Sequence, residues 1–73
     1  MTLKEMIERE CRYHGAMNVD GTIDDDVAVY INYDMLLRHS NEITSTHGGF
    51  YIGNTRVLID HRLADNIVQI SLV

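Results

Sequence analysis

One stretch of the chain, residues 27–33, does most to limit how the protein can fold. It reads VAVYINY, so apolar side chains recur at every second position. This alternation is typical of a β-strand. Both alternating faces are partly apolar, which predicts a central strand with neighbours on each side. One face is Val27, Val29, Ile31 and Tyr33, and the other is Ala28, Tyr30 and Asn32.

An amphipathic helix is predicted at residues 2–14. Thr2 and Glu5 have the spacing of a capping box, with Met1 and Met6 in the positions of a hydrophobic staple. Gly15 favours an end to the helix just after residue 14. The apolar stripe of this helix contains Leu3, Met6, Ile7, Cys11 and His14.

The remaining segments are shorter. Residues 15–26 form a polar connection in which Asp20 and Gly21 could make a tight hairpin turn between Val19 and Thr22. Residues 34–46 fit either a short helix capped by Asp34 or an extended strand, and we favour the helix. Antiparallel strands are expected at 50–52, 56–61 and 67–73. The fold class is therefore α+β: an N-terminal amphipathic helix packed on a small antiparallel β-sheet of three to four strands, as a single domain.

The charge of the chain is strongly asymmetric. Its 73 residues include 6 Lys+Arg and 11 Asp+Glu, with Lys4 as the one lysine. Scattered arginines argue against direct binding to nucleic acid or to an anionic membrane, which require clustered positive charge. Acidic residues do cluster, which fits either a solvated loop or a surface that attracts a basic protein partner, such as the nucleic-acid-binding surface of another protein. The cluster is Asp20, Asp24, Asp25, Asp26 and Asp34.

Size favours self-association. A domain of this length buries only about 60% of the surface of its unfolded chain, so a lone monomer is marginally stable. Residues 67–73 carry no charge and no proline, a pattern typical of strands that pair between molecules. We expect a homodimer or larger assembly with Gln69 facing the partner. No apolar run of about 18 residues and no signal segment is found, so we expect a cytoplasmic protein.

Two patterns raise the question of a metal. Residues 18–24 resemble the middle of an EF-hand calcium loop, but Ala16 and Val27 stand where that loop needs its first ligand and its closing glutamate. Cys11 and His14 have a ligand-like spacing, and His39, His47 or His61 could supply further ligands, but no second pair accompanies them. We therefore predict no structural metal and no cofactor.

No catalytic arrangement is apparent. Asp60 and His61 are adjacent in a predicted strand and would point to opposite faces. The sequence instead indicates a non-enzymatic interaction protein, an adaptor or inhibitor of the kind that mobile genetic elements also encode. A structural subunit of a self-assembling oligomer is the first alternative, and a weak metal-responsive binding protein is the second. The expected partner-binding residues are Asp20, Asp24, Asp25, Asp26, Tyr30, Asp34, Tyr51 and Gln69.

Overall fold

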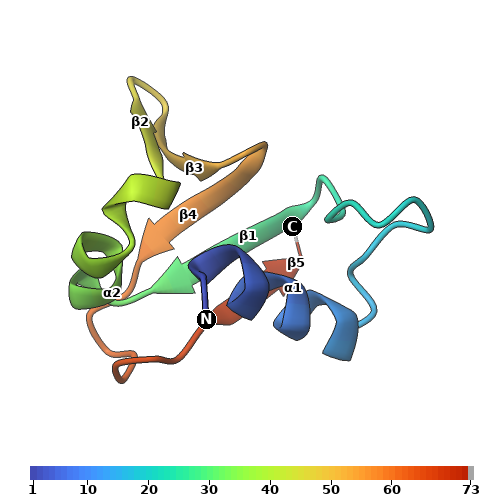
Figure 1. Cartoon of the computed structure of the whole chain (residues 1–73), viewed down its shortest axis with the longest axis horizontal. Coiled ribbons are helices and arrows are strands. Elements are labelled where there is room, and N and C mark those ends of the chain that lie inside the picture. Colours follow the sequence, from blue (N-terminus) through green and yellow to red (C-terminus); the bar gives the residue numbers. More distant parts are fainter. Residues whose placement is uncertain (73) are drawn as a thin grey trace.

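The computed structural model describes residues 1–72, which form two α-helices and one five-stranded sheet (Figure 1). The strand order is β2-β3-β4-β1-β5, so β2 and β5 are the two edges. The elements are α1 (Leu3–Tyr13), β1 (Val27–Ile31), α2 (Tyr33–Arg38), the 3-10 turn η1 (Ser40–Glu42), β2 (Thr44–Thr46), β3 (Gly49–Ile52), β4 (Thr55–Ile59) and β5 (Gln69–Leu72).

Local signals set both ends of α1. Thr2 is the N-cap, and its reciprocal hydrogen bonds with Glu5 complete the predicted capping box. At the other end Gly15 has φ +70°, and the N–H of Ala16 donates to the carbonyl of Cys11 at 2.7 Å. This is the glycine-dependent end that the sequence predicts.

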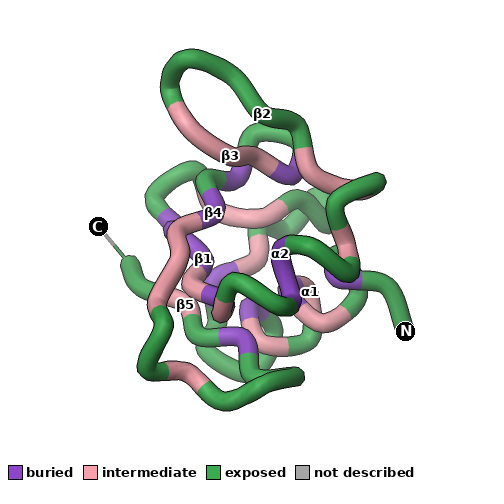
Figure 2. Tube along the Cα trace, turned by 90° about the vertical axis from the view of Figure 1, so that its left-hand side faces the viewer, coloured by how far each residue is buried: buried purple, intermediate pink, exposed green. Residues whose placement is uncertain are grey.

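The core lies between α1 and one face of the sheet. Leu3, Ile7 and Cys11 of α1 are completely buried, as are Val29 and Ile31 of β1. Figure 1 shows α1 lying across β1 and β5, and Figure 2 shows the exposed β2 end of the sheet in green. The predicted packing on the sheet is confirmed for Leu3, Ile7 and Cys11, with Met6 partly buried at the margin, whereas His14 of the predicted stripe is exposed.

The prediction of an antiparallel sheet with three to four strands is wrong in two respects. There are five strands, and β1 pairs in parallel with β4 while pairing antiparallel with β5. The parallel pair arises because α2, η1, β2 and β3 all intervene between β1 and β4, so the chain returns to the end of the sheet where β1 began. The interior position of β1 is confirmed.

Residues 34–46 combine the two structures that the sequence allowed. A short helix comes first and the strand β2 follows. The N-cap of α2 is Asn32 rather than Asp34, because the Asn32 side chain accepts a hydrogen bond from the N–H of Met35 at 2.8 Å. Tyr33 consequently belongs to α2 and not to the preceding strand.

The strands at the end of the chain are shorter than predicted. β4 stops at Ile59, because Asp60 turns to accept hydrogen bonds from Arg62. β5 begins only at Gln69, after Asn66 adopts a left-handed φ of 64° and Val68 turns into the core. The last residue of the expected strand, Val73, lies outside the described residues.

Candidate functional site

The acidic connection between α1 and β1 is an ordered hairpin. Met17 and Ile23 form an antiparallel bridge, and the N–H of Asn18 donates to the carbonyl of Thr22 at 2.7 Å. Gly21 takes φ +87°, which suits the last position of a three-residue loop. The turn expected around Asp20 and Gly21 therefore forms, but it is one residue wider than the tight turn predicted between Val19 and Thr22.

Two aspartates of this connection organise its backbone. The carboxylate of Asp20 accepts hydrogen bonds from the N–H of Thr22 at 3.0 Å and from its hydroxyl at 2.6 Å. These bonds, the hydroxyl first, lower the pKa of Asp20. Asp24 similarly accepts from the N–H of Asp26 at 3.0 Å. Asp25 makes no such bond within residues 1–72, so its carboxylate is available to other groups.

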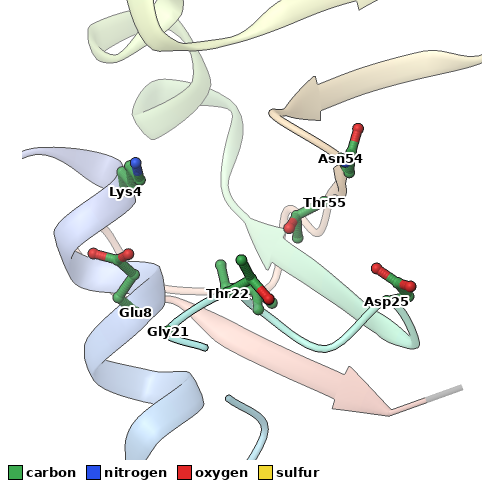
Figure 3. A pocket seen from close by; sticks show the side chains of 8 residues that line it. Lys4, Glu8, Gly21, Thr22, Asp25, Asn54 and Thr55 are labelled. Carbon is green, nitrogen blue, oxygen red and sulfur yellow. The ribbon is translucent and has the colours of Figure 1, made fainter. Parts of the chain in front are cut away.

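A polar hollow of about 320 Å³ lies beside this hairpin. α1 forms one wall, the hairpin connection forms a second, and the turn between β3 and β4 forms the third (Figure 3). Figure 3 shows Glu8 and Asp25 on opposite sides of the hollow, with Thr55 between them. The lining residues are Lys4, Glu8, Gly21, Thr22, Ile23, Asp25, Asn54 and Thr55.

The hollow is negatively charged. Glu8 and Asp25 outnumber Lys4, and among residues 1–72 neither carboxylate has a Lys, Arg or His nitrogen within 4.0 Å. Arg12 follows Glu8 by one helical turn but makes no ion pair with it. Two arginines elsewhere do pair with carboxylates, Arg38 with Asp65 and Arg62 with Asp60.

Thr55 is the one buried polar side chain of the described core, with 8% of its surface exposed. Its hydroxyl takes part in none of the side-chain hydrogen bonds within residues 1–72. Fully buried polar side-chain atoms in the same residues all have partners. The Thr55 hydroxyl is therefore not sealed in the core: it faces the hollow, where it can accept or donate a hydrogen bond.

The face of the sheet opposite α1 carries Tyr30 and Tyr51, two of the predicted partner-binding residues. Residues paired across strands share a face. Gln69 pairs with Tyr30, and Tyr30 pairs with Leu58. Tyr51 pairs with Arg56. Arg56 is two residues before Leu58 in β4, so the two side chains lie on the same face of the sheet. Tyr30, Tyr51 and Gln69 are thus brought to one open surface, separate from the acidic hairpin.

A second hollow, of about 330 Å³, is apolar. It lies between α2, η1 and the β2–β3 hairpin, where Leu36, Leu37, Ile43 and Phe50 contribute most of its wall. Asp34 is near this side of the molecule, in the first turn of α2, and beside a small cleft that it shares with His61. The structure therefore does not group Asp34 with the other four aspartates.

The metal-like pairs are not assembled into a site. Cys11 is completely buried, and desolvation raises the pKa of its thiol, with smaller contributions from Glu10 and Glu8. His14 is at the exposed end of α1 with its Nε2 3.4 Å from Glu10. His39 bonds instead to Glu42. In the part of the chain that the structure describes, no three His, Cys, Asp or Glu side chains are placed to hold a metal ion.

Sequence reasoning located the acidic hairpin but missed Glu8, Asn54 and Thr55 as its neighbours. Glu8 reads in the sequence as one of several charges on the outer face of a helix, and Asn54 and Thr55 read as parts of a turn and strand. Only the packing of α1 beside the β3–β4 turn brings them together.

Comparison with protein-family models, with curated proteins and with solved structures finds no match to this chain. Among residues 1–72, neither helix has the length and apolar character needed to cross a membrane.

Proposed function

We propose that this chain is a non-enzymatic protein-binding domain, an adaptor or inhibitor, that docks on a basic segment of a protein partner. The surface that would bind it, here called the acidic surface, consists of Asp20, Asp24, Asp25, Asp26 and Glu8. One observation carries the proposal. Glu8 and Asp25 line one hollow between α1 and the hairpin connection, the other three aspartates belong to the same connection, and none of the five is paired with a Lys or Arg side chain of residues 1–72.

The electrostatics support this function. The formal charge of the chain is −5, and its free carboxylates are concentrated where the hairpin meets α1. Exposed charges lose little hydration when a partner approaches, so they speed association and select partners of opposite sign. Such binding weakens as salt screens it over about 10 Å at 0.1 M ionic strength.

A basic model peptide tests the proposal. We expect a peptide of alternating arginine and glycine to bind saturably in calorimetry and to bind less tightly as salt is raised. The double variant Asp25→Asn with Asp26→Asn should weaken binding by roughly tenfold, since about 1.4 kcal/mol corresponds to one such factor. These two positions are chosen because neither carboxylate holds the hairpin backbone in place.

A charge-matched control separates the acidic surface from net charge alone. Asp34→Asn with Glu10→Gln removes the same charge from positions outside the acidic surface. This control should leave affinity within about twofold of the native protein. Equal losses in the two double variants, or no saturable binding by the native chain, would contradict the proposed function.

A self-assembling structural subunit is the second candidate, and β5 favours it. β5 is an edge of the sheet. Leu72 at its end is 60% exposed, and Ile67, two residues before its start, is 47% exposed. An uncharged edge strand has unpaired backbone groups that a second copy can complete. The weak metal-responsive class has no comparable structural support, and it depends on the chelator experiment described below.

A further inference from the structure

We infer that the polar hollow admits one arginine side chain of the basic partner, with the Thr55 hydroxyl accepting a hydrogen bond from the guanidinium group. This inference rests on the proposed function, because it names the group that the acidic surface would recognise. It depends on three independent properties of the hollow: its charge, the openness of Thr55 and the arrangement of its walls.

The charge of the hollow fits one monovalent cation. Its two carboxylates, Glu8 and Asp25, and the single ammonium group of Lys4 leave one negative charge. The guanidinium group of arginine stays protonated at any physiological pH. One arginine therefore brings the lining to neutrality, whereas a divalent cation would leave it positive and an anion would increase the imbalance.

Thr55 provides an acceptor that the folded chain leaves unused. The residue is 8% exposed, and its hydroxyl faces the hollow without an intramolecular partner in residues 1–72. Because this hydroxyl is open to the hollow rather than sealed in the core, water can reach it in the free protein. A guanidinium donor in the hollow takes the place of that water, and hydrogen bonds that involve a charged group are the stronger kind.

The walls favour arginine over lysine. Glu8 on α1, Asp25 on the hairpin connection and Thr55 at the start of β4 approach the hollow from different directions (Figure 3). A guanidinium group has five N–H donors spread over a planar fork, while an ammonium group concentrates three donors at one point. One donor can reach Thr55 while others face the carboxylates directly or through water.

The test uses acetyl-arginine-amide as the probe and follows the backbone amide signals of the ¹⁵N-labelled protein by NMR. We expect saturable shifts centred on Thr22, Ile23, Asn54 and Thr55 at millimolar probe, the range for so small a ligand. The uncharged isostere acetyl-citrulline-amide should produce none, and acetyl-lysine-amide should bind more weakly. Equal shifts with arginine and citrulline probes, or no saturation with arginine, would overturn the inference.

Two variants of one residue give the sharpest test. Thr55→Val keeps the shape and removes the hydroxyl, so it should weaken the arginine probe by roughly tenfold, the loss expected for one hydrogen bond to a charged group. Thr55→Ser keeps the hydroxyl and should retain most of the affinity. Because the hydroxyl has no partner in the free protein, Thr55→Val should not lower the melting temperature. Equal probe affinity in Thr55→Val and native protein would contradict the role of Thr55.

Failure of this inference is distinguishable from failure of the proposed function. If the arginine–glycine peptide binds, and its affinity depends on Asp25 and Asp26 but not on Thr55, the acidic surface acts without the hollow and this inference is wrong. If the peptide does not bind at all, the proposed function itself fails.

Discussion

The carboxylate of Glu42 accepts a hydrogen bond from the backbone N–H of Leu3 at 3.0 Å, across 39 residues of sequence. The N–H of Lys4 donates to the same carboxylate at 3.1 Å, and Nδ1 of His39 lies 3.0 Å from it. Unsatisfied N–H groups at the start of a helix favour negative charge. Glu42 therefore stabilises the first turn of α1 from a distant segment, next to the local cap supplied by Thr2.

The Glu42 contact predicts how stability depends on pH. Burial alone raises the pKa of Glu42, but the hydrogen bonds from Leu3, Lys4 and His39 together outweigh it, and the pKa lies below the ordinary value of 4.5. A lowered pKa contributes stability that is present above about pH 4.5 and is lost as pH falls through the folded-state pKa. Glu42→Gln should lower the free energy of unfolding by about 1–2 kcal/mol at pH 7.

The measurement is urea denaturation of native and Glu42→Gln protein at several pH values. The difference between them should shrink as the pH falls below 4.5. Glu10→Gln is the control, because Glu10 does not contact the start of α1. A difference that stays constant from pH 7 to pH 3 would show that the Glu42 charge does not stabilise the helix.

Shortening a buried side chain of α1 should lower the stability of the protein. Ile7 is completely buried in the core between α1 and the sheet. Ile7→Ala should lower the free energy of unfolding by about 2–4 kcal/mol, as large-to-small core substitutions do. Val19, which is fully exposed at the tip of the hairpin, is the control, and Val19→Ala should change stability by less than about 0.5 kcal/mol. Similar midpoints for the two variants in urea would contradict the packing of α1.

The stability cost of replacing Gly15 should depend on the backbone conformation of the new residue and not on the space for its side chain. A Cβ at this position meets no atom within 4 Å, but φ is +70°. Gly15→Ala should therefore cost about 1 kcal/mol of stability, the order of the penalty for an L-residue in the left-handed region. Gly15→Asn should cost less, since asparagine adopts this region more readily. Thermal denaturation of both variants checks the order, and an equal or reversed order would contradict it.

Self-association through β5 is tested by light scattering. We expect the native protein to be at least a dimer, and Gln69→Lys to be folded but monomeric, because a charge on an open edge strand opposes pairing. Ile70→Lys should unfold the chain, since Ile70 packs against the core from the same strand. A native protein that is monomeric at high micromolar concentration would rule out this mode of assembly.

Removal of metal should have no effect on stability. Cys11 is packed in the core and His14 is at the helix end near Glu10, so the two do not form a ligand pair. We expect the melting temperature to be the same with and without excess chelator. A decrease of several degrees that zinc or calcium reverses would instead support the metal-responsive class.

The elements that sequence predicted well depend on local interactions. The capping box of Thr2 and Glu5 and the left-handed Gly15 define α1 within a few residues of chain. The alternating sequence of β1, with apolar residues on both faces, likewise predicts that one segment is buried on both sides. Each of these signals involves residues that are close together in the sequence, so it can be recognised without knowing the fold.

The elements that sequence missed depend on contacts between distant segments. β2 is the polar tripeptide Thr44–Thr46 and becomes a strand only because β3 pairs with it. The parallel register that sets Val29 opposite Val57 has no local signature at either residue. The same limit applies to the candidate site: the run of aspartates is readable, whereas the burial of Thr55 depends on how α1 and the hairpin pack.

The position of β1 has a consequence for how the chain folds during synthesis. β1 is made early, but both of its neighbours, β4 and β5, come from the last third of the chain. Val29 and Ile31 must stay without their sheet partners on the ribosome until β4 has emerged, and the outer side of β1 stays open until β5 follows. Non-local pairing of this kind slows folding and lengthens the exposure of an aggregation-prone strand. The interval between the synthesis of β1 and that of β5 is therefore the period in which the apolar faces of β1 are most exposed.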